Sequence, residues 1–142
     1  MQLTSFTDYG LRSLMYLAAR PESTCSVREI ADYYGISRNH LVKVIHRLAQ
    51  TEYIISSKGK GGGIRLAEQA ATSRLGDIVR ALEPSMHLVE CFDPVSNSCC
   101  ISEACKLKQY LSEAQNQFLQ ALNQYTLADT VKNPTLFFTQ SQ

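Results

Sequence analysis

The sequence predicts a mainly α-helical fold: a winged helix-turn-helix with a two-stranded β-wing, followed by a long C-terminal dimerisation helix. Three observations predict it: two capped amphipathic helices separated by a short turn, a glycine-rich loop between two β-prone segments, and an apolar stripe of helical period late in the chain. The length of 142 residues allows one compact domain with a helical extension and excludes two large domains.

The cationic residues are concentrated in the first half of the chain. The whole sequence has a formal net charge of +1, but residues 1–66 carry nine Lys and Arg against five acidic residues, a net charge of +4. Because counterion release depends on local cationic density, this asymmetry is typical of polyanion binding. Hydrophobic residues make up 44% of the chain and charged residues 19%, which excludes a disordered protein.

The first three expected helices contain the helix-turn-helix unit. Apolar residues at helical spacing predict a helix over residues 6–19. A capping box at Ser26 starts a second helix at Val27, which ends at Gly35, where glycine tolerates the left-handed conformation. Ser37 caps a third helix, whose apolar residues recur every three or four positions. This arrangement is typical of a helix pair whose second helix enters the major groove of DNA.

The third helix and the wing supply the candidate DNA-binding residues. Residues 53–57 and 64–66 are expected to be the strands of the wing. Arg can pair with guanine and Asn with adenine, whereas Lys and Ser hold phosphates, and glycines let a cationic wing approach the minor groove. The candidates are Ser37, Arg38, Asn39, His40, Lys43 and Arg47 on the helix, and Lys58, Lys60, Gly61, Gly62 and Arg65 on the wing.

Two alternatives to this interpretation remain open. The helix pair could be a hairpin inside an unrelated all-α domain. The glycine-rich loop could bind a nucleotide phosphate, although it lacks the Gly-Lys-Ser/Thr sequence that opens a helix in such loops.

The second half of the chain is expected to hold a metal and to dimerise. Residues 73–82 predict a short helix, and from about Glu103 a long amphipathic helix follows. Its apolar stripe is Leu107, Leu111, Ala114, Phe118, Ala121 and Tyr125. A symmetric dimer is the simplest way to bury such a stripe, and packing onto its own domain is the alternative. The chain thus divides into a winged helix-turn-helix domain (1–72), a cysteine loop with the dimerisation helix (73–132) and a flexible tail (133–142).

Four of the five cysteines lie within fifteen residues, from Cys91 to Cys105. The chain shows neither a secretory signal nor a membrane-spanning apolar run, so we expect a cytoplasmic protein without membrane contact, in which cysteines stay reduced and bind metal. Thiolates favour iron–sulfur, zinc or copper(I), and the paired C-x-x-C knuckles of structural zinc are absent. Cys99 and the adjacent Cys100 rarely serve one cluster together, so we expect three thiolates and a different fourth ligand. Cys25 is expected to be a small buried side chain.

Catalysis by a cysteine nucleophile is not supported. His40 and His46 fall on the expected third helix, and only His87 is near the cysteine loop. No nucleophile–base arrangement follows from this placement, so we expect that the chain is not an enzyme.

Six segments along residues 1–132 carry specific motifs: MQLTSFTDYGLR, SRNHLVKVI, KGKGGGIRL, GDIVRALEP, CCISEACKLK and NQYTLADTV. Together they resemble the Rrf family of winged-helix transcription regulators, and most closely its nitric-oxide-sensitive repressors. The resemblance implies a homodimer that binds an inverted-repeat operator in double-stranded DNA. It also implies one iron–sulfur cluster per subunit, 2Fe-2S or 4Fe-4S, bound by Cys91, Cys99 and Cys105, with Cys100 as an extra cysteine.

The resemblance also implies a fourth ligand, Asp8, donated by the partner subunit. From the residues alone, Asp8 would only favour the positive N-terminus of the first helix, and His87, Glu90 and Asp93 are the other candidates. In a sister group that senses cluster supply, a histidine follows the third cysteine by three residues, where this chain has Lys108. On the family pattern, nitric oxide would release the operator and derepress nitrosative-stress genes. The alternative within the family is cluster-supply or redox sensing.

Overall fold

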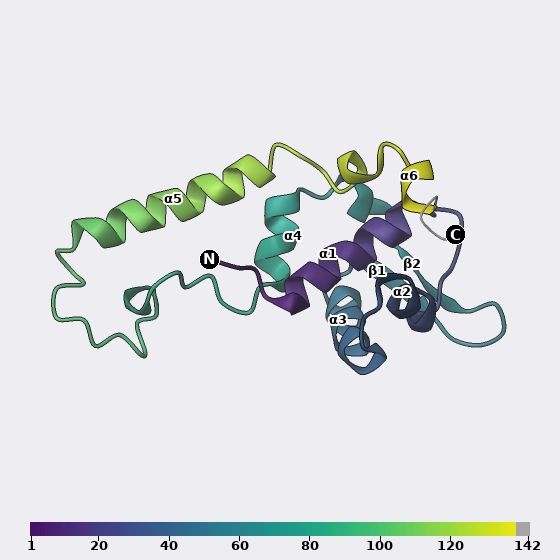
Figure 1. Cartoon of the computed structure of the whole chain (residues 1–142), viewed down its shortest axis with the longest axis horizontal. Helices are drawn as coiled ribbons and strands as arrows, with labels where there is room; N and C mark the ends of the chain where they lie inside the picture. Colours follow the sequence, from purple (N-terminus) through teal and green to yellow (C-terminus); the bar gives the residue numbers. More distant parts are fainter. Residues whose placement is uncertain (139–142) are drawn as a thin grey trace.

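A computed structural model describes residues 1–138 of the chain and confirms the predicted fold class (Figure 1). The elements are α1 (Ser5–Ala18), α2 (Val27–Tyr34), α3 (Arg38–Gln50), β1 (Ile54–Ser57), β2 (Gly63–Leu66), η1 (Glu68–Thr72), α4 (Leu75–Leu82), η2 (Glu90–Phe92), α5 (Lys106–Leu122), η3 (Ala128–Val131) and α6 (Thr135–Phe138). Helices α1 to α4 and the wing form one body, and α5 projects from it as an arm. No helix among the described residues is both long and apolar enough to cross a membrane.

The helix boundaries follow the predicted capping chemistry. In the capping box of α2, the Glu29 backbone N–H donates to Ser26 Oγ at 3.1 Å, and the Ser26 N–H donates to the Glu29 carboxylate at 2.6 Å. Gly35 ends the helix with φ +64°, the left-handed conformation that glycine adopts without a Cβ clash. Ser37 occupies the N-cap of α3 as predicted, but its side chain makes no capping hydrogen bond to any described residue.

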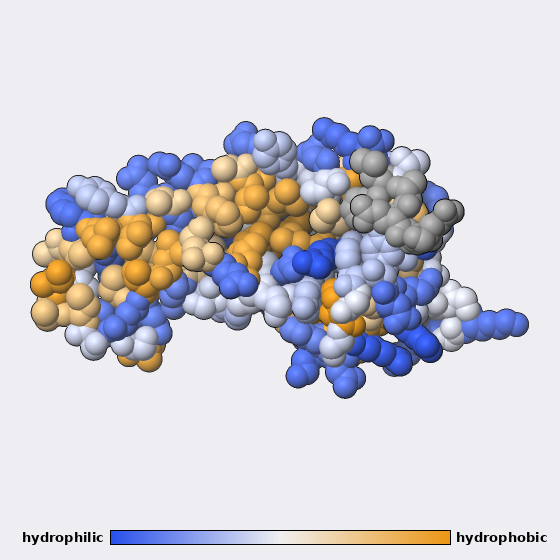
Figure 2. Space-filling model, in the orientation of Figure 1, coloured by the Kyte–Doolittle hydropathy of each residue, from blue (hydrophilic) through white to orange (hydrophobic). Residues whose placement is uncertain are grey.

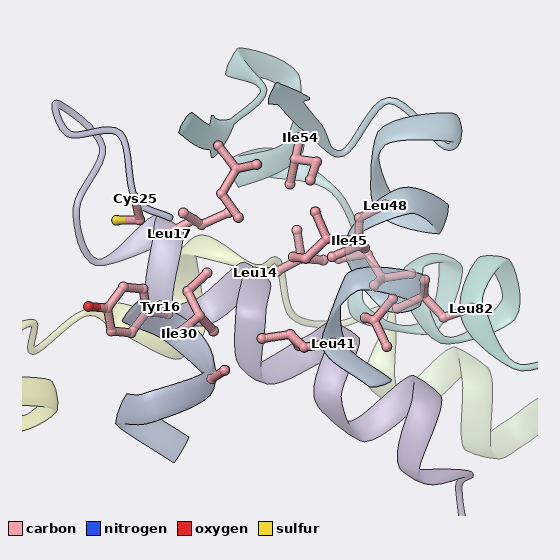
Figure 3. Packing of buried hydrophobic residues seen from close by; sticks show 14 of the residues in the cluster. Leu14, Tyr16, Leu17, Cys25, Ile30, Leu41, Ile45, Leu48, Ile54 and Leu82 are labelled. Carbon is pink, nitrogen blue, oxygen red and sulfur yellow. The ribbon is translucent and has the colours of Figure 1, made fainter. Parts of the chain in front are cut away.

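The hydrophobic core lies where α1, α2, α3 and the wing meet (Figure 3). The predicted core positions of the third helix are confirmed as buried: Leu41, Val44, Ile45 and Leu48. Leu82 of α4 belongs to the same core, because a Cβ at Gly10 of α1 would lie 2.6 Å from its Cδ1 atom. Helix α4 therefore packs directly on α1, and the core continues across the predicted boundary at residue 72.

The wing is an antiparallel pair whose register places Ile54 opposite Leu66 and Ser57 opposite Gly63. Backbone hydrogen bonds of 2.8 Å in both directions join Cys25 to Ile64, so the wing is attached to the turn before α2. Cys25 is 2% exposed, which confirms the prediction of a small buried side chain.

Helix α5 is shorter than predicted and only partly covered. It begins at Lys106, since backbone hydrogen bonds hold residues 99–104 in turns. Of its residues, all described, only Leu119 is buried, whereas Leu107 of the predicted stripe is 63% exposed. Asn123 fixes its C-terminal end by hydrogen bonds of 3.1 Å to the backbone and the carboxylate of Asp77 in α4. The other end of the arm extends away from the body.

The predicted flexible tail, residues 133–142, is described as far as Phe138. The Phe138 ring packs edge-on against Tyr16 of α1 with a centroid separation of 6.0 Å, and the Arg20 guanidinium lies 4.2 Å from its centroid. Residues 139–142 lie outside the described part of the chain. The flexibility of the tail stays a prediction.

Candidate nucleic-acid interface and metal centre

The polar face of α3 presents the predicted DNA-binding side chains to solvent. Arg38, Asn39 and Lys43 are exposed and lie opposite the buried apolar positions of the same helix. Helix α3 lies at the lower edge of the molecule in Figure 1, below α1. The surface over α3 and the wing tip is mostly hydrophilic (Figure 2). This face carries the donors and cations that contact with base edges and phosphates requires.

Two predicted contact residues of α3 also bind other helices. His40 is half-buried, and its ring packs edge-on against Tyr9 of α1 with a centroid separation of 5.1 Å. Arg47 is exposed, but its guanidinium donates to the Ala81 carbonyl of α4 at 3.1 Å. These contacts fix the rotation of α3 about its axis, so both residues orient the helix in addition to any role toward DNA.

The wing carries its predicted cations on an exposed tip. Lys58, Lys60, Gly61 and Arg65 are exposed, and Gly62 is half-buried. Gly59 and Gly61 have φ values of +95° and +79°, so the turn depends on glycine at these positions. The tip points away from the body on the side opposite α5, as Figure 1 shows. This geometry suits insertion of a cationic loop along a DNA groove.

The cysteine loop between α4 and α5 holds four free thiols. Cys99 and Cys100 are exposed, and Cys91 and Cys105 are half-buried. The Glu90 carboxylate accepts hydrogen bonds of 2.6 Å from both the backbone N–H and the hydroxyl of Ser98. These two residues immediately precede Cys91 and Cys99, so this link joins the two backbone segments that carry these predicted ligands. The hydroxyl and backbone donors of Ser98 also lower the pKa of the Glu90 carboxyl.

Further side-chain hydrogen bonds shape the loop around the exposed cysteines. Asp93 accepts from the Val95 N–H at 2.9 Å and the Ser96 hydroxyl at 2.7 Å, and the Ser96 hydroxyl is the main cause of its lowered pKa. The Asn97 side chain accepts from the Cys99 N–H at 3.0 Å. Glu90 and Asp93 were considered above as alternative fourth ligands. In this structure their carboxylates accept hydrogen bonds that hold the loop in its conformation.

The three predicted cysteine ligands do not converge within one subunit. Among residues 1–138, no three side chains of His, Cys, Asp or Glu form a group that could hold a metal ion. The donor set nevertheless fits a soft metal, because Cys91, Cys99 and Cys105 are free thiols on a loop held mainly by surface hydrogen bonds. The assignment of these ligands stays a prediction.

Asp8, the predicted fourth ligand, is on the first turn of α1. Its carboxylate forms an ion pair with Arg12, with Arg12 Nη2 at 2.7 Å from Oδ2 and Nε at 3.1 Å from Oδ1. The Asp8 side chain is 43% exposed and lines a hollow of about 560 Å³ between α1 and the end of α2. It is therefore accessible to another molecule.

A polar link that no sequence pattern predicts joins α1 to the start of the cysteine loop. Glu83, the residue after α4, accepts a hydrogen bond of 2.6 Å from the Thr7 hydroxyl. The same carboxylate accepts from the backbone N–H and the hydroxyl of Thr4, the N-cap of α1, at 3.2 Å each. Thr7 is fully buried and precedes Asp8. The link therefore couples the helix that carries Asp8 to the segment that leads to Cys91.

Comparison with known proteins identifies the class of regulator. Residues 3–133 match the Rrf2 family, described as an iron-dependent transcriptional regulator. A Listeria innocua protein described as a transcriptional regulator is 27% identical, covering 94% of this chain and 88% of its own, with a TM-score of 0.72. IscR from T. potens is 26% identical, covering 93% of this chain and 87% of its own, with a TM-score of 0.72. The oxidized form of CymR from Staphylococcus aureus shares the fold at 24% identity and a TM-score of 0.71, covering 93% of this chain and 97% of its own. Because the family consists of transcription regulators, the expectation that the chain is not an enzyme is confirmed.

Proposed function

Because the chain belongs to the Rrf2 family of transcriptional regulators, we propose that it is a repressor of the NsrR type, which senses nitric oxide through an iron–sulfur cluster. Rrf2 regulators bind DNA and act as dimers. The observation that carries the proposal is the loop of free thiols in which a hydrogen-bonded link joins Glu90 and Ser98, the residues that precede Cys91 and Cys99. The regulator would act in the cytoplasm on an inverted-repeat operator and repress genes for nitrosative-stress defence.

The proposed ligands come from both subunits of the dimer. Cys91, Cys99 and Cys105 of one subunit would bind the cluster together with Asp8 of the partner subunit. When bound, the cluster supplies iron that reacts directly with nitric oxide. Exposure of the Asp8 side chain supports access from a second chain. Arg12 offers the Asp8 carboxylate an alternative partner whenever that carboxylate is not a ligand.

Contacts at the C-terminal end of α4 couple the start of the cysteine loop to the DNA-binding face. Glu83 holds the N-terminal turn of α1 through Thr4 and Thr7, while the Ala81 carbonyl holds Arg47 of α3. A shift of the C-terminal end of α4, from Ala81 to Glu83, would therefore act on α1 and α3 together. In a dimer, such a shift changes the separation of the two recognition helices and lowers affinity for an operator of fixed half-site spacing.

The test is operator binding by anaerobically reconstituted protein, before and after exposure to nitric oxide. The operator is first selected from random duplex DNA with the reconstituted dimer. We expect nitric oxide to weaken binding by about tenfold or more, within the usual range of coupling between two sites. Equal binding in both conditions would contradict the proposal.

Two adjacent cysteines provide a matched pair for this test. Cys99 and Cys100 are both exposed, and only Cys99 is a proposed ligand. Cys99→Ser should lose the visible absorbance of the cluster and the response to nitric oxide, whereas Cys100→Ser should keep both. Equal loss in the two variants would show that the assignment of Cys99 is wrong.

Sensing of cluster supply is the second candidate function, favoured by the 26% identity to T. potens IscR. Lys108, in place of the histidine that follows the third cysteine in that group, disfavours it. DNA binding by the cluster-free protein distinguishes the two. Sequence-specific binding that persists without a cluster would favour the supply sensor over the nitric-oxide sensor.

A further inference from the structure

One apolar side chain interrupts the polar face of α3. Val42 is 48% exposed, whereas Leu41, Val44 and Leu48 of the same helix are at 0%. Position 42 falls outside the spacing of the buried residues, so the helical repeat alone places it toward solvent. The sequence pattern predicts a polar face here and does not single out Val42 as a candidate contact.

The neighbours of Val42 on the helix surface are predicted DNA contacts. Residues three and four positions apart share one side of a helix, so Val42 lies beside Arg38 and Asn39 in the preceding turn. Lys43 follows directly and is also exposed. Single exposed valines are common on protein surfaces, but this one lies among the cations and the amide that complement the phosphates and base edges of DNA.

The orientation of Val42 is fixed before DNA binds. Helix α3 is held by its buried face, by the His40 ring against Tyr9, and by Arg47 on the Ala81 carbonyl. A β-branched side chain in a helix has one strongly preferred χ1 rotamer, so Val42 loses little freedom when it is covered. Its methyl groups therefore present a stiff apolar surface to whatever the face of α3 contacts.

The major groove offers one apolar group on its base edges, the C5-methyl of thymine. We propose that Val42 is a specificity-determining residue that packs against the methyl group of a thymine in each operator half-site. Asn39 and Arg38 would read adjacent base edges by hydrogen bonds, and Val42 would select thymine by shape and desolvation. This inference rests on the DNA-binding part of the proposed function and is independent of the cluster.

The experiment removes the methyl group from the DNA and the valine from the protein. Each thymine of the selected operator is replaced in turn by uracil, which lacks only the C5-methyl, and binding is measured for the wild type and for Val42→Ala. Loss of one buried methyl-sized contact should weaken wild-type binding about three- to fivefold at one position per half-site. The same uracil should leave the affinity of Val42→Ala unchanged.

Two features of the chain keep this result interpretable. Alanine is a better helix former than valine, so Val42→Ala should not unfold α3. Gln50→Ala truncates an exposed side chain at the other end of the same helix and should keep the wild-type response to every uracil. If each uracil affects the wild type and Val42→Ala equally, Val42 does not contact a thymine methyl and the inference is overturned. Failure to select any operator would instead contradict the proposed function itself, and this inference with it.

Discussion

The DNA-binding half, formed by α1 to α4 and the wing, and the cysteine half, formed by the cysteine loop and α5, differ in how much of their apolar surface a single chain buries. In the first half, Leu14 and Leu41 are at 0% exposure, and no buried polar side-chain atom among the described residues is without a hydrogen bond. In the second half, Val95 is 93% exposed, and Leu107 and Tyr110 are each 63% exposed. The DNA-binding half folds around one core shared by α1, α2, α3, α4 and the wing, whereas the cysteine half leaves apolar surface for another molecule to cover.

Figure 2 makes this difference visible, because hydrophobic surface runs from the free end of α5, over the cysteine loop, to the region where α5 meets α4. Segments with few buried contacts reorganise at low free-energy cost. The proposed function requires a loop that gathers its thiols around a metal and responds to a signal, and such a loop fits this region. Because α1, α3 and α4 share one core, a small displacement of the loop would be transmitted to α3.

The largest expected effect is a difference in the free energy of unfolding between a substitution in the DNA-binding half and one in the cysteine half. Leu14→Ala removes a fully buried side chain from the core of the DNA-binding half and should lower the free energy of unfolding by about 2–5 kcal/mol. Leu107→Ala removes an equally large side chain that is 63% exposed, and should change the free energy of unfolding of the monomer by less than about 0.5 kcal/mol. Urea denaturation of dilute protein measures both.

The same pair of variants tests what covers α5. If a second subunit covers it, Leu107→Ala should raise the dissociation constant of the dimer, measured by analytical ultracentrifugation, while the fold persists. Equal destabilisation of the fold by both variants would show that Leu107 is covered by its own chain. The contrast between the two halves would then be wrong.

A smaller effect is expected where the two halves meet. Glu83→Ala leaves the buried Thr7 hydroxyl without its carboxylate acceptor and should lower the free energy of unfolding by about 1–3 kcal/mol. It should also reduce the difference in operator affinity between the cluster-bearing and nitric-oxide-treated protein, because α1 is no longer held to the cysteine loop. Glu68→Ala, on the exposed side of η1, serves as the control. If Glu83→Ala destabilises the protein but keeps the full response, the link is structural only.

Sequence patterns were sufficient for the DNA-binding half because its elements are determined locally. The capping box at Ser26, the left-handed Gly35 and the apolar repeat of α3 each depend on residues a few positions apart. The same local patterns predicted that α5 begins at about Glu103. It begins at Lys106 because residues 99–104 form turns, which the apolar repeat does not indicate.

Contacts between distant segments were not predictable in this way. Glu83 and Thr7 are 76 positions apart, and Arg47 and Ala81 are 34 apart, so no periodicity or motif connects them. The candidate cluster site is harder still, because its ligands are proposed to come from two chains and to converge around a metal. The assignment of Asp8 as a fourth ligand came from the resemblance to a family and not from the spacing of the cysteines.

The smallest expected effect concerns a tyrosine that joins two helices of the DNA-binding half. The Tyr34 hydroxyl of α2 donates to the Arg12 carbonyl of α1 at 3.0 Å, and burial raises the pKa of Tyr34 from 10.0 to about 12. Since the folded protein holds this proton more tightly than the unfolded chain, the stabilisation is complete below pH 10 and is lost as the pH rises toward about 12.

Tyr34→Phe should therefore lower the free energy of unfolding by about 1 kcal/mol at neutral pH, through loss of the hydrogen bond, and should make its decline between pH 10 and pH 12 shallower. Tyr125→Phe, at a position 58% exposed beyond the end of α5, should change neither quantity. Urea denaturation at a series of pH values measures both variants. An alkaline decline as steep in Tyr34→Phe as in the wild type would show that the titrating group lies elsewhere. The junction between α1 and α2 would then not be the alkali-sensitive point of the DNA-binding half.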